Sequence, residues 1–313
     1  MTPGGILIHE VGMRDGLQVE AQVVPTSQKI AWIEQLLSSN VDFIQVGSFV
    51  NPKVLPQMAD TDALFAHFRA RSAAAPKSPT LTALVLNEKG LERGLAAGVT
   101  YFCMGVSASD THSRKNTAMA TDEALERILA MAATARAAGA IVQVSVQSAF
   151  GCGFEGTIPE TRVLRLVDRF IGAGIRLVSL ADTAGHASPA QVERLFVNVH
   201  AIDPDVVCAV HLHDTYGMAM ANACAALRAG VRYFESAFGG LGGCPFTALA
   251  GGNLCTEDFV HLLQRDGHRR DIKLDPIADV ARSAGQFLGR ALPGYVHKTG
   301  AIGSQMQFEG AKA

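Results

Sequence analysis

One short pattern recurs along this chain and constrains its fold more than any other feature: a helix-like stretch ends in Ala-Gly, and an apolar run follows at once. Glycine just past a helix end adopts the left-handed backbone conformation at little steric cost, so each recurrence predicts a helix that leads into a strand. Asn40 replaces the glycine once. The Ala-Gly pairs stand at 97–98, 138–139, 173–174 and 229–230. The chain is therefore predicted to repeat strand and helix units.

Two of the intervals between these junctions are long enough for two units of about 30 residues each, which is the size of a strand–helix repeat. Ala75-Pro76 and Asp203-Pro204 stand inside those intervals, each a few residues before another apolar run. Eight strands are therefore predicted. They are Ile6–Val11, Phe43–Val46, Leu81–Leu86, Tyr101–Val106, Ile141–Val146, Leu177–Leu180, Val206–Leu212 and Tyr233–Phe238.

The segments between these strands carry helix signals. Thr26 is expected to cap a helix with Ile30, Ile33 and Leu36 on one face. Ser188-Pro189-Ala190-Gln191 has the form of a capping box with proline at the first helical position. Short, almost wholly apolar strands that alternate with helices are typical of a parallel sheet covered by helices. We predict an α/β fold, a closed (β/α)8 TIM barrel.

The predicted barrel occupies residues 1–268, and residues 269–313 are expected to form a C-terminal helical region and tail packed on it. An open doubly wound sheet is the alternative architecture. Its G-x-G-x-x-G fingerprint should follow the first strand, where this chain has Val11-Gly12-Met13-Arg14-Asp15-Gly16 instead. The spacing of the glycines therefore favours the barrel.

Composition narrows the class of function. With 48% hydrophobic and 18% charged residues, the chain can bury a sizeable core. Its 27 Lys and Arg against 29 Asp and Glu give a net charge of -2 without a basic block, so no nucleic-acid partner is expected. No apolar run approaches the ~20 residues that cross a bilayer, and residues 1–5 show no secretory-signal pattern, so we expect neither a membrane partner nor secretion. Its 6 cysteines form no C-x-x-C pair, which suits free thiols and a cytoplasmic location.

Catalytic groups of a TIM barrel gather at the C-terminal ends of the strands. His211 and His213 are two residues apart on a predicted strand, so both imidazoles should face the same side. Imidazoles that converge beside a carboxylate, here Asp15, are typical of a metal site. Oxygen and nitrogen donors without a thiolate favour Mg²⁺ or Mn²⁺. Arg14 would place a fixed cation near a developing enolate oxygen.

A glycine-dense loop at residues 239–245 follows the last predicted strand and carries Cys244. Two interpretations stay open: a phosphate cradle in which the thiol is incidental, or a mobile lid that delivers the thiol as an acid or base. Asn253 is either a turn residue or an oxygen ligand of the metal. Other polar residues at strand ends are Glu10, Gln45, Ser48, Ser179, Asp182 and Asp214.

Several motifs together resemble the 3-hydroxy-3-methylglutaryl-CoA lyase family, within the metal-dependent lyases and condensing enzymes that share an Arg-Asp after the first strand. The matches are ordered and cover most of the chain. They are the segments at residues 9–18, 47–53, 56–60, 150–152, 179–183, 211–217 and 239–253.

The resemblance implies an enzyme that cleaves 3-hydroxy-3-methylglutaryl-CoA to acetyl-CoA and acetoacetate, a role in leucine catabolism, and a homodimer. It implies that Asp15, His211, His213 and Asn253 bind the divalent metal. The implied catalytic residues are Arg14, which stabilises the thioester enolate, Cys244, which transfers a proton, Asp182, which lies near the reacting hydroxyl, and His211. Arg14, Gln45, Ser48 and Ser179 are expected to bind the substrate, and the two serines to contact its acyl group.

Three positions depart from the family pattern. Gln45 stands where the second strand usually carries a glutamate, Met13 replaces a common proline, and Met218 stands where glutamine is frequent. An amide keeps hydrogen bonds but cannot act as a base. The alternatives are therefore a sibling lyase for another 3-hydroxyacyl-CoA such as citramalyl-CoA, an isopropylmalate-synthase-like condensing enzyme, or a binding protein without catalysis. The residues at 213–215 and 243–245 argue against the synthase.

Overall fold

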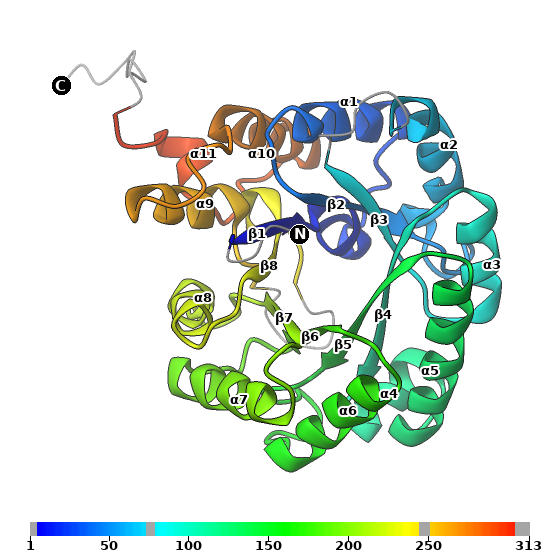
Figure 1. Cartoon of the computed structure of the whole chain (residues 1–313). Helices are drawn as coiled ribbons and strands as arrows, with labels where there is room; N and C mark the ends of the chain where they lie inside the picture. The colour runs from blue at the N-terminus through cyan, green and yellow to red at the C-terminus, as the bar shows by residue number, and fades with distance from the viewer. Residues whose placement is uncertain (1–4, 73–78, 244–250, 304–313) are drawn as a thin grey trace, which may run out of the picture.

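The computed structural model describes residues 5–72, 79–243 and 251–303. All strands in this part of the chain pair in parallel and in sequence order, and β8 pairs with β1, so the sheet closes into a barrel (Figure 1). The predicted TIM barrel is confirmed, and each predicted strand has its counterpart. The strands are β1 (Leu7–Glu10), β2 (Phe43–Ser48), β3 (Thr80–Leu84), β4 (Tyr101–Ser107), β5 (Ile141–Gln147), β6 (Leu177–Asp182), β7 (Val207–Leu212) and β8 (Tyr233–Ser236).

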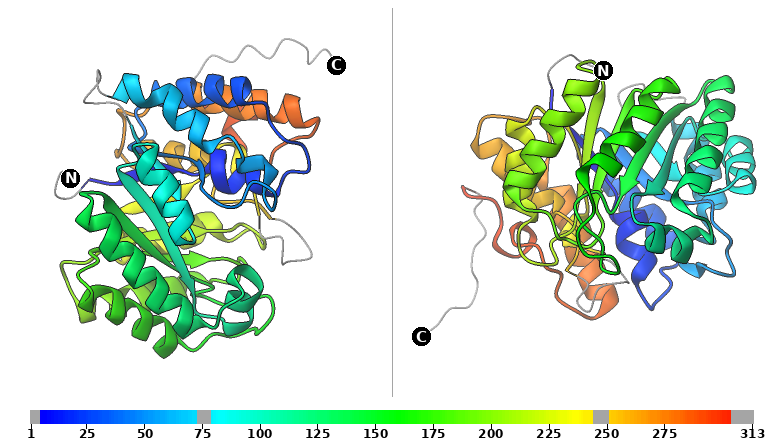
Figure 2. Two further views of the ribbon diagram at one scale, coloured as in Figure 1. Left: turned by 90° about the vertical axis from the view of Figure 1, so that its right-hand side faces the viewer. Right: turned by 90° about the horizontal axis from the view of Figure 1, so that it is seen from below.

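Helices surround the barrel on its outer side, as Figures 1 and 2 show. α10 packs against α1 and α9, so the C-terminal helices close the ring beside the first helix. The expected boundary at residue 268 stays a prediction. No helix among the described residues is long and apolar enough to span a bilayer. The α-helices are α1 (Thr26–Leu37), α2 (Thr61–Ser72), α3 (Glu88–Ala96), α4 (Asp110–Thr117), α5 (Thr121–Ala137), α6 (Glu160–Gly172), α7 (Pro189–Ile202), α8 (Ala219–Arg228), α9 (Thr256–Arg265), α10 (Leu274–Leu288) and α11 (Val296–Thr299).

The junctions predicted from the Ala-Gly pairs have the expected backbone. Gly98 and Gly139 each have a φ angle of 83°, Gly174 has 77° and Gly230 has 91°. Asn40 adopts the same left-handed region with a φ of 66°. These values lie where L side chains are disfavoured, so the local signal and the helix-to-strand reversal have one physical cause.

One predicted helix cap is wrong, and the other, Ser188 followed by Pro189 at the first position of α7, is confirmed in position but not in its side-chain hydrogen bonds. Thr26 is the first residue of α1, and its hydroxyl donates a hydrogen bond of 2.9 Å to Asp60 instead of capping the helix. Ser188 does precede α7, but its side chain makes no capping hydrogen bond. The Gln191 amide donates to the carbonyl of Phe150, at 3.2 Å, rather than back to Ser188. In both cases a tertiary partner has replaced the local one.

Glu10, at the end of β1, ties together the segments that surround the barrel mouth. Its carboxylate accepts hydrogen bonds from the Gly12 amide at 2.7 Å, the Phe238 amide at 3.1 Å and the Thr256 hydroxyl at 2.5 Å. The side chain is fully buried. Burial raises the pKa of Glu10 to about 8 although these donors oppose the shift. The turn after β1 is therefore anchored to the segment after β8 and to the start of α9.

Replacing Glu10 by Gln tests this anchor. The amide can accept from both backbone N–H groups and donate to Thr256, so the variant should fold. A carboxyl group whose pKa is raised in the folded state stabilises the protein at low pH and loses that contribution as pH rises through the folded-state value. We expect the free energy of unfolding of Glu10→Gln, relative to wild type, to increase between about pH 5 and about pH 8 by on the order of a few kcal/mol. Urea unfolding at several pH values measures it, and a constant difference would contradict the assignment.

Candidate active site

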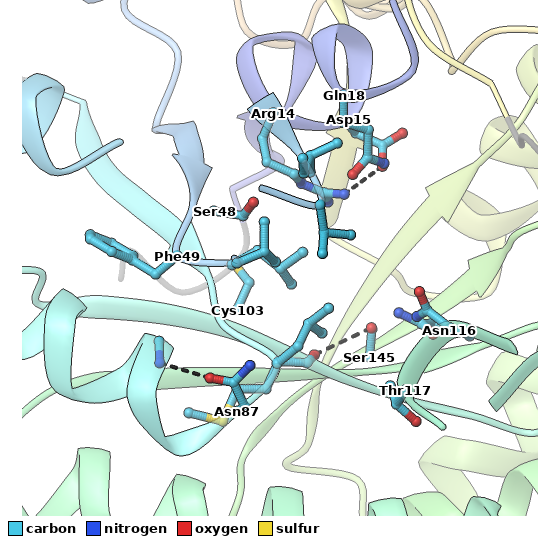
Figure 3. Close-up of a pocket in the computed structure, with 18 of the residues that line it drawn as sticks. Arg14, Asp15, Gln18, Ser48, Phe49, Asn87, Cys103, Asn116, Thr117 and Ser145 are labelled. Carbon is cyan, nitrogen blue, oxygen red and sulfur yellow. Dashed lines mark hydrogen bonds and ion pairs between the residues drawn. The ribbon is translucent and has the colours of Figure 1, made fainter. Parts of the chain in front are cut away.

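A turn of π-helix, η1 (Gly12–Gly16), follows β1 and places Arg14 and Asp15 at the barrel mouth. The Asp15 amide donates a 2.7 Å hydrogen bond to the Val11 carbonyl, which holds the turn. A Cβ atom on Gly12 would lie 2.6 Å from the Phe238 ring, so only glycine fits there. From this compact turn both side chains reach the wall of the pocket, where a hydrogen-bonded ion pair joins them (Figure 3).

Asp15, His211 and His213 converge as predicted. The Nε2 atoms of the two imidazoles are 3.3 Å apart, and they lie 3.7 and 3.4 Å from the same Asp15 oxygen, Oδ2. All three ligand atoms lie within 4.8 Å of one another. Burial alone would raise the pKa of Asp15, but Arg14 and the two imidazoles hold it well below its usual value. The carboxylate is therefore ionised and available as a ligand.

Asn253 contacts two members of this cluster, His213 through its backbone and Asp15 through its side chain. An isolated antiparallel bridge pairs it with His213, and its amide nitrogen donates to Asp15 and to the Leu241 carbonyl, both at 2.9 Å. Its Oδ1 atom is buried and has no hydrogen-bond partner among the described residues. A buried oxygen without a partner, on a residue whose amide contacts Asp15 and whose backbone pairs with His213, suits a divalent cation. The predicted four-residue donor set fits a metal ion.

The remaining nitrogen of each imidazole is already bonded. Nδ1 of His213 lies 2.7 Å from the Thr183 carbonyl, and Nδ1 of His211 lies 2.9 Å from Glu235. A carbonyl and a carboxylate accept but do not donate, so both Nδ1 atoms donate. In the neutral imidazoles that metal binding requires, both Nε2 lone pairs then face the cluster. Burial would raise the pKa of Glu235, but His211 and Arg14 lower it to about 2.

Arg14 is held on two sides. Its Nη1 donates to Asp15 at 2.5 Å, and its Nε donates to the Gln45 side-chain oxygen. The other end of that amide, Nε2 of Gln45, is buried without a partner among the described residues, and so is the Ser48 hydroxyl. The Gln45 amide nitrogen and the Ser48 hydroxyl therefore lie near the Arg14 guanidinium, and both can still form hydrogen bonds.

A cavity of about 1470 Å³ opens at this end of the barrel. Figure 3 shows residues of its wall, with Ser48 from β2 and Cys103 from β4 near Arg14. The predicted residues in its wall are Arg14, Asp15, Gln45, Ser48, His211 and His213. A space of this size holds a large ligand, and the donor residues Asp15, His211 and His213 are part of its wall.

Other predicted residues do not line this cavity. Ser179 lies below it, and its hydroxyl donates to Glu235 at 3.1 Å. Both carboxylate oxygens of Asp182 accept from backbone amides, those of His186 at 2.8 Å and Ala187 at 3.1 Å. Asp182 therefore shapes the loop after β6, and its catalytic role stays a prediction. Cys244 falls outside the described residues.

Sequence reasoning missed Glu235, which lines the cavity and contacts a predicted ligand. Its signal was present, because an acidic residue inside a short strand otherwise made of aromatic and small residues is costly unless it is paired. Glu10 and Asp182 also end strands, but neither lines the cavity. Side chains alternate between the two faces of a strand, and these two face the helices.

Comparisons with known proteins agree with this geometry. A family model described as HMGL-like matches residues 6–283. The chain belongs to the HMGL-like family. It is 37% identical over 291 residues to hydroxymethylglutaryl-CoA lyase YngG of Bacillus subtilis, an alignment that covers 93% of this chain and 96% of that protein. It is also 37% identical to (R)-citramalyl-CoA lyase of Chloroflexus aurantiacus, with 96% of both chains covered.

A solved structure of an HMG-CoA lyase from Acinetobacter baumannii, in complex with coenzyme A and 3-methylmalate, resembles this HMGL-like chain with a TM-score of 0.87. The two sequences are 35% identical, and the match covers 95% of each chain. This chain is therefore an enzyme of the HMGL-like lyase family. Its relatives named above include lyases of different substrates at the same identity, so family membership leaves the substrate open.

Asp15→Asn tests the donor cluster directly. The amide has the same shape but lacks the charge and cannot present two acceptor oxygens. Removing a residue that only hydrogen-bonds to a metal ligand typically lowers metal affinity by at least about 10-fold. Because Asp15 is itself a proposed ligand, we expect the affinity for Mn²⁺ to fall by more than about 10-fold. Electron paramagnetic resonance of free Mn²⁺ measures it without substrate. Asp122→Asn, at an exposed pair with Arg165, is the matched control and should leave binding unchanged.

Proposed function

We propose that this chain is a divalent-metal-dependent lyase that cleaves 3-hydroxy-3-methylglutaryl-CoA to acetyl-CoA and acetoacetate. The observation that carries the proposal is the set of Asp15, His211, His213 and Asn253 beside a held arginine at the base of a large cavity. The relatives named as lyases of this substrate support it. We infer Mg²⁺ or Mn²⁺ as the ion, because the donors are oxygen and imidazole nitrogen without a thiolate.

The reaction breaks one carbon–carbon bond. The carbinol hydroxyl at C3 loses its proton and becomes a ketone, while the electron pair of the C2–C3 bond passes into the thioester as an enolate. A proton then adds at C2 to give the acetyl thioester. A bound divalent ion supplies polarisation of the carbinol hydroxyl and of a nearby substrate oxygen. No atom or electron enters from another reactant.

The chain's own residues fit these charges. Arg14 is fixed by Asp15 and Gln45, so its guanidinium can stabilise the enolate oxygen without reorganising. His213 and His211 are held by their Nδ1 atoms, which keeps the donor cluster in place through the cycle. Cys244, outside the described residues, remains our predicted proton donor to C2. The cytoplasmic location and the homodimer likewise remain predictions.

A second candidate substrate is citramalyl-CoA, and Gln45 favours it. The unused Nε2 of Gln45 and hydroxyl of Ser48 can donate hydrogen bonds to a carboxylate beside Arg14. The two candidate substrates both carry such a carboxylate, but in citramalyl-CoA it is attached to the carbinol carbon itself. The (R)-citramalyl-CoA lyase among the relatives is consistent with this alternative.

The deciding assay measures acetoacetate released from 3-hydroxy-3-methylglutaryl-CoA by the purified full-length protein with Mg²⁺ or Mn²⁺. We expect release with metal and loss of at least about 100-fold of the rate with excess chelator, because donor-cluster residues alone cannot polarise the hydroxyl. A parallel assay follows pyruvate from citramalyl-CoA. Pyruvate without acetoacetate would replace the main proposal by the second candidate, and silence on both would contradict a lyase of either kind.

Gln45→Glu separates the two substrates. The change removes a donor and adds a carboxylate oxygen beside Arg14, which disfavours a substrate carboxylate held close to the metal cluster. We expect the ratio of kcat/KM values to shift about 10-fold toward 3-hydroxy-3-methylglutaryl-CoA, whose carboxylate lies one methylene further from the carbinol carbon. Gln147→Glu makes the same change elsewhere in the cavity wall and is the control. An unchanged ratio would mean that Gln45 does not read the carboxylate.

A further inference from the structure

Glu235 lies on β8, contacts the donor residue His211 and is 6% exposed. One carboxylate oxygen, Oε2, lies 2.9 Å from Nδ1 of His211. The other, Oε1, accepts from the Gln143 amide and from the Ser179 hydroxyl, the latter at 3.1 Å. Each oxygen is therefore occupied by donors from β5, β6 and β7, and the side chain has one orientation.

The direction of these hydrogen bonds follows from a chain of partners below Glu235. The Tyr101 hydroxyl donates to the Gln143 carbonyl oxygen at 2.8 Å, which leaves the NH₂ end of that amide to face Glu235. Tyr101 also contacts the Tyr233 hydroxyl at 2.8 Å, and Tyr233 lies 3.2 Å from Nδ1 of His9. These side chains are all buried, so the chain of partners fixes orientation inside the barrel instead of leading protons to solvent.

The two imidazoles are held in different ways. Nδ1 of His213 donates to a backbone carbonyl, that of Thr183, which no side-chain substitution removes. Nδ1 of His211 depends on the Glu235 side chain. If that carboxylate were replaced by a group that donates, the proton of His211 would move to Nε2 and block the nitrogen that faces Asp15. The orientation of one ligand therefore rests on a residue outside the donor cluster.

We propose that Glu235 is a positioning residue that fixes the ring and the tautomer of His211 for metal binding. The inference rests on the metal site of the proposed function and adds a residue that reaches the ion only through His211. Removing the hydrogen-bond partner of a metal-bound histidine typically lowers metal affinity by 10- to 100-fold. We therefore expect loss of the Glu235 carboxylate to lower metal affinity by about 10-fold or more.

The experiment measures Mn²⁺ affinity of the substrate-free full-length protein by electron paramagnetic resonance for wild type, Glu235→Gln and Glu235→Asp. Glu235→Gln should bind Mn²⁺ about 10- to 100-fold more weakly. The NH₂ group of the new amide must face either Nδ1 of His211 or the donors of Gln143 and Ser179, and in both orientations a donor meets a donor. Glu235→Asp keeps the charge but has a shorter reach, so a smaller loss is expected. Glu193→Gln on the surface is the matched control.

The outcomes separate this inference from the proposed function. If wild type fails to bind Mn²⁺, the proposed metal site itself is wrong. If wild type binds and a folded Glu235→Gln binds equally well, only the positioning role is overturned. Near-ultraviolet circular dichroism reports folding, and if Glu235→Gln does not fold, wild-type affinity in Glu235→Asp would overturn the role. Excess Mn²⁺ should also restore most of kcat in a folded variant, which a purely structural defect would not permit.

Discussion

Pairing between β1 and β8 closes the sheet and sets Leu7 beside Tyr233 and Glu10 beside Ser236. Asp15 follows β1, whereas His213 precedes β8 by 20 residues and Asn253 follows β8 by 17. Even so, Nε2 of His213 and Nδ2 of Asn253 lie 3.4 and 2.9 Å from the same Asp15 oxygen. In an open sheet with this same strand order the first and last strands would lie at opposite edges, and these donors could not share an ion. The carboxyl ends of all strands meet on one face of a closed parallel barrel, so closure itself creates the site.

Closure also explains why the polar floor of the barrel can be buried. Four different strands supply its side chains, which are His9, Tyr101, Gln143 and Tyr233. Their polar atoms are hydrogen-bonded to one another across the barrel axis. An unpaired polar group in this interior would cost about 1–3 kcal/mol, whereas a fully connected set costs little and becomes rigid. The catalytic end of the barrel thus rests on a layer whose side chains have few alternative arrangements.

Local features of the sequence were enough to predict the strands and the convergence of His211, His213 and Asp15. Glycine junctions and the two-residue strand period are set by residues a few positions apart, and the structure keeps both. The predictions that failed depend on distant partners. Asp60, 34 residues away, takes the hydroxyl of Thr26 from its cap, and the contact between His211 and Glu235 needs the register of β7 on β8. No local pattern reports that register.

Charge accounting gives Gln45 a physical meaning within this frame. Arg14 carries one positive charge, and Asp15 and Glu235 carry two negative charges, so the buried set has a net charge of 1 minus 2, or -1, with neutral imidazoles. A divalent ion brings it to +1. A glutamate at position 45 would bring the same loaded set to zero, because it would add a second carboxylate against the Arg14 guanidinium. In a low-dielectric cavity that difference acts strongly on an anion. In the proposed function, Gln45 would therefore leave the metal-loaded site with an uncompensated positive charge, and two unused hydrogen-bonding groups beside it, for a substrate carboxylate.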